Sequence, residues 1–161
     1  MSMNSRDRVL TALEHREPDR VPYDLASMNV TGIHVQAYNN LREYLGLPER
    51  EPVFADVIQQ IVIPHQDLYN RLEVDTRGLF PRTSSNWGIT HEDAGENWRY
   101  TDEFGLVLEF PKEGGYWYSL VKSPIPETET TVEAVKNYPL PTPDQPERVE
   151  GLRDLALAYR S

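Results

Sequence analysis

The sequence predicts an α/β protein in which strand and helix alternate near the amino terminus and an antiparallel β meander follows. Two observations support this prediction. Residues 16–34, REPDRVPYDLASMNVTGIH, place a short apolar run between a proline-bounded joint and a polar loop that leads into a helix. Residues 97–121 contain three runs rich in β-branched and aromatic residues, separated by the acidic and glycine residues that turns require.

The first helix is expected over residues 5–15, with Ser5 as its N-cap and one apolar face formed by Val9, Leu10 and Leu13. Pro18 ends this pattern, because the residue before a proline is driven out of the α region. Residues 21–26 then have the length and composition of a strand, and Pro22 suits its start because proline lacks an amide donor. Such a strand followed by a polar loop and a helix is a βα unit, and in βα barrels sites lie at that end of the strand.

A second helix is expected over residues 32–45, where apolar side chains recur every fourth position, flanked by two tyrosines, until Gly46 and Pro48 stop it. The members of this stripe are Ile33, Ala37, Leu41 and Leu45, with Tyr38 and Tyr44 beside them. Residues 53–55 are expected to be extended, and the stretch up to residue 63 fits either a strand pair or a strand followed by a helical turn.

A third helix is expected over residues 66–72, with Leu68, Tyr69 and Leu72 as its apolar stripe. Residues 74–79 follow as a second strand. Its alternation places Asp75 and Arg77 on the same face, so these side chains either pair at a sheet edge or point into a polar cavity.

Residues 80–97 have the composition of a loop, and the meander follows it with strands over residues 97–101, 105–110 and 116–121. A short helix is expected over residues 130–137 with Thr130 or Thr131 as its cap. A last helix is expected over residues 147–159, with an apolar side formed by Val149, Leu152, Leu155, Ala156 and Tyr159.

Charge and composition exclude several classes of function. The formal net charge of −10 would repel a phosphate backbone, which argues against nucleic-acid binding. The chain has no cysteine, so it has no disulfide, no thiolate zinc ligand and no catalytic thiol. No apolar run approaches the ~20 residues of a membrane span, and the amino terminus carries charges where a signal peptide needs its apolar core. We therefore expect a soluble protein located in the cytoplasm.

Three segments together resemble the uroporphyrinogen decarboxylase superfamily, and within it the corrinoid-linked methyltransferase branch. They are RDRVLTALEHREPDRVPYDL, NNLREYLGL with the later LYNRLEVDTRGL, and the segment from DEFGLVLEFPKEGGYWYSLVKSPIP to PERVEGLRDLA. The resemblance implies a single domain over residues 1–161 that forms the first part of a (β/α)8 TIM barrel. In it, residues 1–80 supply the first βα units, residues 81–125 a loop and an inserted antiparallel β meander, and residues 126–161 a proline-rich joint and a helix.

The methyltransferase branch implies a zinc site of His and Cys ligands in later strands of the barrel and a corrinoid protein as partner. This chain contains no cysteine, so we expect it to hold no metal and to have little or no catalysis alone. Its partner would be a chain that completes the barrel or a second copy of itself. The decarboxylases carry an arginine-rich loop after the first strand, whereas residues 27–32 contain no arginine, which argues against a tetrapyrrole substrate with several carboxylates.

Five residues are the candidates for substrate binding, each with an alternative local role. These candidates lie in the polar loop, at the start of the second helix and in the second expected strand: Asn29, Thr31, His34, Asp75 and Arg77. A lone histidine with no second ligand at metal spacing is more often bound locally, and an ion pair between Asp75 and Arg77 explains their spacing equally well.

The other histidines and the aromatic residues are expected to be structural or exposed. His15 is expected to be solvated at the end of the first helix, where the negative end of the helix dipole favours it, and His65 and His91 are expected at the surface in loops, without partners. The aromatic residues could form a platform for a planar ligand, but strand alternation favours a hairpin core made by Trp87, Trp98, Tyr116, Trp117 and Tyr118.

Overall fold

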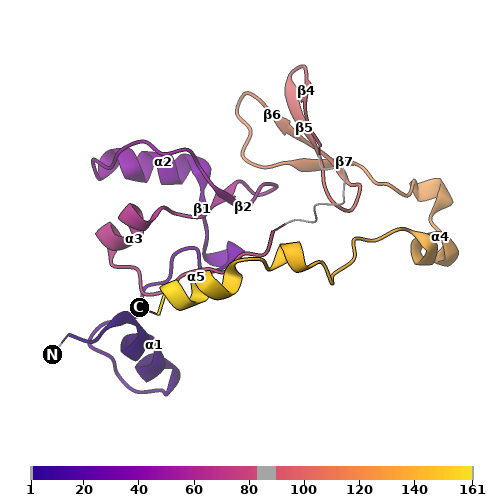
Figure 1. Cartoon of the computed structure of the whole chain (residues 1–161). Coiled ribbons are helices and arrows are strands. Elements are labelled where there is room, and N and C mark those ends of the chain that lie inside the picture. Colours follow the sequence, from indigo (N-terminus) through magenta and orange to yellow (C-terminus); the bar gives the residue numbers. More distant parts are fainter. Residues whose placement is uncertain (1, 83–89, 161) are drawn as a thin grey trace. The chain divides into compact units, whose positions relative to one another are not determined.

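The computed structural model describes residues 2–82 and 90–160, and its contacts divide the chain into two compact units (Figure 1). The first comprises Met1–Phe80 with Ala158–Ser161, and the second comprises Pro81–Leu157. The chain is mixed α/β with two antiparallel sheets, and the strands described form no closed barrel. None of the helices described combines the length and the apolar character needed to cross a membrane. The single domain expected for residues 1–161 stays a prediction.

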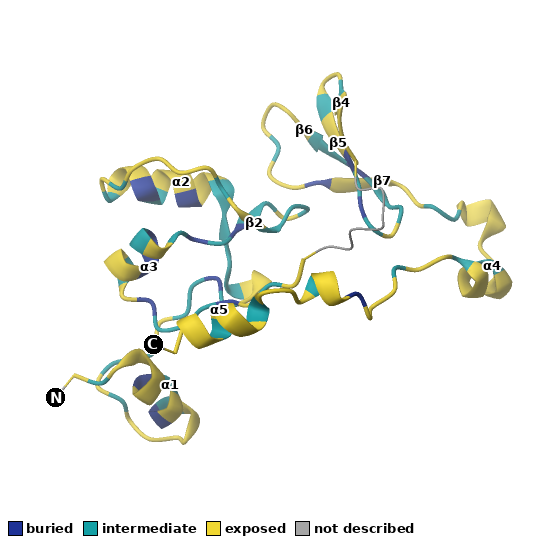
Figure 2. Cartoon of the chain, in the orientation of Figure 1, coloured by how far each residue is buried: buried dark blue, intermediate teal, exposed yellow. Residues whose placement is uncertain are grey.

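Helix α1 (Ser5–Leu13) is capped by Asn4, whose Oδ1 accepts a hydrogen bond from the Asp7 amide at 2.8 Å. The expectation that Ser5 caps the helix was therefore wrong by one residue. The buried residues of α1 are Arg8 and Thr11, whereas Leu13 on the expected apolar face is 70% exposed. Figure 2 shows that most of this helix is exposed. Arg8 forms ion pairs with Asp19 and Asp75, which explains why the polar face of α1 is the buried one.

Helix α2 (Val35–Tyr44) begins three residues later than expected, because Ile33–His34 forms strand β1. This strand pairs with β3 (Ile61–Val62), which also pairs with β2 (Phe54–Asp56), giving an antiparallel sheet of order β1-β3-β2. The extended segment expected at residues 53–55 thus corresponds to β2. Of the two alternatives left open for the residues after it, the strand pair is confirmed.

The core of the first unit lies between α2, β3 and helix α3 (Gln66–Leu72), whose bounds are those predicted. Tyr38, Val62 and Leu68 are fully buried there. Ala37 and Tyr44, expected on or beside the apolar stripe of α2, are exposed. The partly buried residues packed against the core are Ile33, Val35, Leu41, Leu45, Leu47 and Leu72.

The strands expected over residues 21–26 and 74–79 were wrong, because neither segment forms a strand ladder. The two segments nevertheless lie side by side. The Asp75 amide donates to the Tyr23 carbonyl oxygen at 2.8 Å, and the Thr76 hydroxyl donates to the Asp24 carboxylate. A Cβ added to Gly78 would lie 2.9 Å from the Ala26 carbonyl oxygen. Each of these pairs is 52 residues apart, so the segments run parallel.

The second unit contains a four-stranded antiparallel meander in the order β4-β5-β6-β7. Strand β5 (Asn97–Thr101) matches its prediction, while β6 (Val107–Pro111) and β7 (Ser119–Lys122) begin two and three residues late. Strand β4 (Thr90–Ala94) lies where the sequence predicted only a loop. It pairs with β5 along its whole length, so the meander has one strand more than expected.

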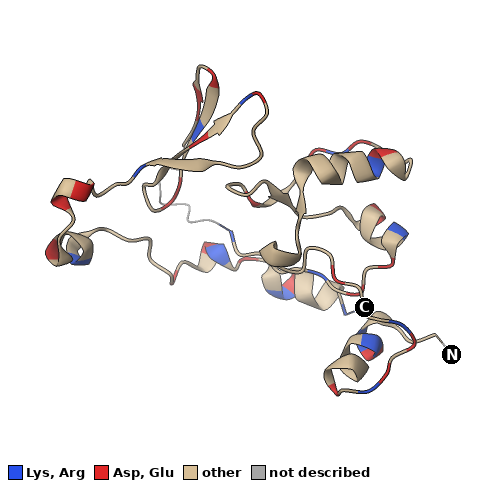
Figure 3. Cartoon of the chain, turned by 180° about the vertical axis from the view of Figure 1, so that it is seen from behind, with Lys and Arg blue, Asp and Glu red and all other residues tan. Residues whose placement is uncertain are grey.

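The segment after the meander contains two short helices. In α4 (Val132–Asn137) the Thr131 side chain accepts a hydrogen bond from the Ala134 amide at 3.0 Å, which confirms one of the two expected caps. Helix α5 (Leu152–Ala158) is shorter than the predicted helix, because residues Pro146–Arg148 form a separate 3-10 turn and Gly151 adopts a φ of +76°. Acidic side chains occur on helices, strands and loops of both units (Figure 3).

Candidate functional site

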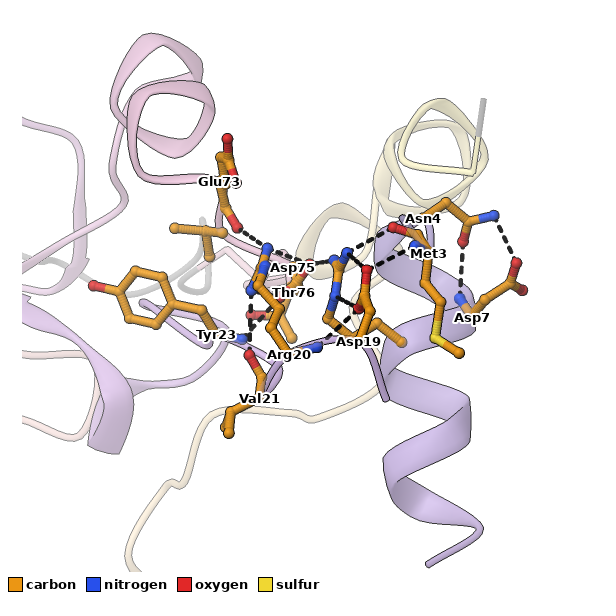
Figure 4. A network of polar contacts seen from close by, with 12 residues as sticks. Met3, Asn4, Asp7, Asp19, Arg20, Val21, Tyr23, Glu73, Asp75 and Thr76 are labelled. Carbon is orange, nitrogen blue, oxygen red and sulfur yellow. Dashed lines mark hydrogen bonds and ion pairs between the residues drawn. The ribbon is translucent and has the colours of Figure 1, made fainter. Parts of the chain in front are cut away.

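A network of two arginines and two aspartates joins α1 to the start of each parallel segment (Figure 4). Arg8 contacts Asp19 at 2.7 Å and Asp75 at 2.5 Å, and Arg20 contacts the other oxygen of Asp75 at 2.7 Å. The Tyr23 amide donates to Asp75 at 2.8 Å, and the Asp75 side chain is 0% exposed. This network therefore fixes the spacing of the two segments near their amino-terminal ends.

Electrostatics keep both aspartates of the network ionised. Hydrogen bonds from Arg8 are the largest cause that lowers the pKa of Asp19. Burial alone would raise the pKa of Asp75, but hydrogen bonds from the Tyr23 amide, Ser5 and the two arginines outweigh it, so the pKa is lowered. A buried carboxylate so fully paired is suited to holding structure rather than to exchanging a proton with a substrate.

A second polar cluster lies further along the same two segments, around Asp24. Its carboxylate accepts hydrogen bonds from the hydroxyl groups of Thr76 and of Ser27, the latter at 2.8 Å. Burial would raise the pKa of Asp24, but hydrogen bonds from Thr76, Ser27 and Thr31 outweigh it and lower the pKa. The result is an ionised acceptor surrounded by hydroxyl groups, which connects the first segment both to the second segment and to the loop that follows the first.

Asp24 was not among the predicted site residues, although the sequence contains one signal for it. An acid within an apolar run that is followed three residues later by Ser or Thr is able to accept a hydrogen bond from that residue's backbone and side chain. Ser27 makes both of these bonds to Asp24. The contact with Thr76 has no local signal, because it joins residues 52 apart.

Of the predicted loop residues, only Thr31 belongs to this cluster. The Asn29 side chain donates instead to Asp56 at 3.3 Å. His34 is the N-cap of α2, and its Nδ1 accepts from the Gln36 amide at 3.2 Å, as the local alternative for this histidine proposed. The structure thus does not bring these three residues together around one point.

Asp75 and Arg77 do not pair with each other among the contacts described. Arg77 lies over the ring of Tyr69, with 4.1 Å between its Cζ and the ring centroid, and donates to the carbonyl oxygens of Val74 and Thr76. Burial raises the pKa of Tyr69 to about 12. Substrate binding by the five predicted residues stays a prediction, and for Asp75 the geometry favours a structural role.

The expectation that His65 and His91 lack partners was wrong. The Nδ1 of His65 lies 2.6 Å from the Tyr38 hydroxyl, which also accepts from Arg42 at 3.2 Å. His91 contacts the Tyr118 hydroxyl through Nε2 and stacks on Trp98 with 6.0 Å between ring centroids. In both cases the tyrosine partner is 27 residues away, so no local pattern predicted the contact.

The aromatic residues of the meander are partly a core, as expected. Tyr118 is buried and packs 5.2 Å from Phe110 and 5.8 Å from Tyr100, measured between ring centroids. Tyr116 and Trp117, which the prediction placed in that core, are more than half exposed. Trp87 lies outside the described residues.

The residues present do not supply the zinc ligands that the resemblance implies. The chain contains no cysteine, and within residues 2–82 and 90–160 there is no group of three or more His, Asp or Glu side chains that could hold a metal ion. No chemical step through zinc therefore follows from these residues.

The polar clusters around Asp75 and Asp24 are thus the two arrangements that could position a ligand or a neighbouring strand. Comparison with known proteins adds no assignment to them. No family model matches the chain, and neither a curated protein nor a solved structure resembles it significantly.

Proposed function

We propose that this chain forms the opening βα units of a uroporphyrinogen decarboxylase-like barrel of the corrinoid-linked methyltransferase type. On this proposal the zinc ligands and the contacts with a corrinoid protein belong to residues outside this chain. The observation that supports it is the parallel alignment of residues 23–26 with residues 75–78, in which successive contacts keep one spacing of 52 residues.

Parallel neighbours require a crossover of a dozen or more residues, and a helix usually provides it. Here the chain between Ala26 and Val74 passes through α2 and α3 before it returns. The strands expected at these positions would each gain further backbone hydrogen bonds when neighbouring strands complete the sheet. In the chain alone, a single backbone bond, from Asp75 to Tyr23, joins the described residues of the two segments.

The positions of the two polar clusters agree with the separation of site residues from stabilising residues in such a barrel. Sites lie at the carboxyl-terminal ends of the strands, while residues at the opposite ends serve stability. The buried network around Asp75 connects residues at and before the amino-terminal ends of the segments, whereas Asp24 also binds Ser27 and Thr31 in the loop that follows the first segment. We propose that Asp24 orders the loop that forms part of the mouth.

A second candidate function is a self-associating binding module, in which two copies cover each other. Large apolar side chains of the first unit are open to solvent: Leu13 is 70%, Val21 83% and Val30 87% exposed. Such exposure favours association either with a second copy or with the rest of a barrel.

The decisive experiment combines the chain with a separately produced polypeptide that carries later barrel strands with one His and two Cys ligands. Zinc, a thiol and a methylated corrinoid protein are then added, and the absorbance of the cobalt centre reports methyl transfer. We expect no transfer with the chain alone and transfer with the pair. A chain that stays monomeric at all concentrations, unfolds cooperatively and forms no complex would contradict the proposal.

A matched pair of variants localises the interface. Val21→Lys adds a charge at the exposed start of the first parallel segment and is expected to weaken the complex. Val132→Lys adds the same charge on α4, where the side chain is also largely exposed, and is expected to leave the complex unchanged. A symmetric dimer that Val21→Lys disrupts, without any binding to the barrel polypeptide, would favour the self-associating module.

A further inference from the structure

A cavity of about 610 Å3 lies beside the network of Asp75 in the first unit, with a volume in the range of small-molecule sites. Figure 4 labels Arg20 and Glu73 among its lining residues, and these two residues precede the segments that the network joins. Three arginines and one carboxylate line it, although the chain as a whole carries a net charge of −10. The lining residues whose side chains bear on the binding of a charged ligand are Arg8, Arg20, Tyr69, Asn70, Glu73 and Arg77.

Arg77 differs from the other two arginines of the cavity. Arg8 and Arg20 each contact aspartates of the network, whereas Arg77 forms no ion pair within the described part of the chain. Its Nη1 donates to the carbonyl oxygens of Val74 and Thr76 at 2.9 and 2.6 Å. Its Nε and Nη2 have no hydrogen-bond partner among the described residues, and neither belongs to the buried atoms left without one. Both donors are therefore open to a ligand.

The two unused donors form one edge of the guanidinium group, which is the edge that grips an oxyanion with two parallel hydrogen bonds. Arg8 shows this geometry within the same unit, because its Nε and Nη2 bind the two oxygens of Asp19 at 2.7 and 3.1 Å. The Cζ of Arg77 lies 4.1 Å from the centroid of the Tyr69 ring, and this contact together with the two hydrogen bonds of Nη1 restricts the side chain before a ligand binds.

We propose that this cavity binds a small oxyanion, a carboxylate or a phosphate group, through the Nε and Nη2 edge of Arg77. Asn70 lines the same cavity, and its side-chain oxygen accepts from Gln66, which leaves its amide nitrogen as an additional donor toward the ligand. The carboxylate of Glu73 opposes binding and limits the charge that the cavity accepts. This site goes beyond the proposed barrel function and does not depend on it.

The test is a titration of the whole chain by NMR, in which backbone amide shifts are followed at constant ionic strength with chloride as the reference anion. Inorganic phosphate and succinate are the two probes, and the tighter one identifies the preferred group. We expect saturable shifts in residues that line the cavity. Arg77→Gln is expected to weaken binding by about tenfold or more, because two charge-assisted hydrogen bonds are lost.

Arg71→Gln is the matched control, since Arg71 is an exposed arginine of α3 with no ion pair among the described residues. It is expected to bind the probes as the parent chain does. Arg77→Lys keeps the charge without the two-donor edge and is expected to weaken binding, whereas Glu73→Gln is expected to tighten it severalfold. Equal losses in Arg71→Gln and Arg77→Gln, shifts that never saturate, or no effect of Glu73→Gln and Arg77→Lys would each overturn the proposal.

Discussion

At the scale of single residues, the buried carboxylate of Asp75 makes the most consequential contacts of the first unit. We expect Asp75→Asn to lower the free energy of unfolding by about 3 kcal/mol, because it removes the buried negative charge that Arg8 and Arg20 share and leaves Arg8, whose side chain is only 6% exposed, with Asp19 alone. Urea denaturation followed by tryptophan and tyrosine fluorescence measures this loss.

The control for that variant is Asp93→Asn in the second unit. Asp93 pairs with Lys112 at 2.6 Å, but its side chain is 61% exposed, so its ion pair is screened by water. The expected loss is much smaller than that of Asp75→Asn. A loss as large as that of Asp75→Asn would show that burial does not decide the strength of these pairs.

The ion pair between Asp67 and Arg42 predicts a loss of stability in acid. The hydrogen bonds from Arg42 lower the pKa of Asp67 to about 2 in the folded chain, against a usual value of 3.8. A lowered pKa contributes stability above pH ~4, and that contribution disappears as the pH falls through the folded value. We expect Asp67→Asn to flatten the loss of stability between pH ~4 and pH ~2, measured by urea denaturation at each pH. An unchanged pH profile would contradict this assignment.

Of the charged residues in these pairs, sequence patterns singled out only Asp75. Arg8 lies on a helix that was predicted from its apolar face, and hydrophobic periodicity gives no reason to expect a charged side chain of such a helix to be buried. Its two aspartates lie 11 and 67 residues away along the chain. Arg42 was missed for the same reason, since Asp67 is 25 residues distant and belongs to another helix. Contacts between residues so far apart in the sequence can be identified only once the fold is known.

At the scale of elements, the close approach of the two parallel segments predicts the effect of a single methyl group. We expect Gly78→Ala to destabilise the first unit by about 1–3 kcal/mol, because the added Cβ would lie 2.9 Å from the Ala26 carbonyl oxygen and would also meet the Phe80 ring. The Ala26 carbonyl group belongs to the backbone of the neighbouring segment, so it can move away from the added Cβ only if the two segments separate.

Gly46→Ala serves as the comparison for Gly78→Ala. Gly46 has a φ of +66° and no atom within 4 Å of an added Cβ, so alanine there meets backbone strain but no clash. Thermal unfolding of both variants by circular dichroism separates the two causes. If Gly78→Ala also separates Tyr23 from Asp75, hydrogen exchange of the Asp75 amide is expected to accelerate, whereas Gly46→Ala leaves it slow. No change in that amide would contradict the parallel contact.

Elements with strong local signals were predicted well, and elements that depend on neighbours were not. Helix α3 has its predicted bounds, strand β5 likewise, and Thr131 caps α4 as expected. Residues 21–26 have the composition of a strand, yet a ladder needs paired backbone groups on a neighbour. Strand β4 was missed because its residues, THEDA, have low β propensity and form a strand only by pairing with β5.

At the scale of the whole molecule, exposed apolar surface predicts that stability depends on concentration. Association of folded chains stabilises them by mass action, so the midpoint of unfolding rises with protein concentration. We expect this rise for the parent chain, together with a larger apparent mass in sedimentation at high concentration. The residues responsible are expected to be those of the first unit with the greatest exposure, Leu13, Val21 and Val30.

A triple variant in which Leu13, Val21 and Val30 are each replaced by lysine tests that origin. These side chains are 70–87% exposed, so their removal costs little packing within the chain, and the added charges oppose association. We expect the variant to sediment as a monomer and to unfold at a midpoint independent of concentration. In the corresponding control, lysine replaces Val132 and Leu140, which are also exposed but lie in the second unit. We expect this control to retain the concentration dependence of the parent chain. If the control rather than the triple variant abolished that dependence, the second unit would carry the interface.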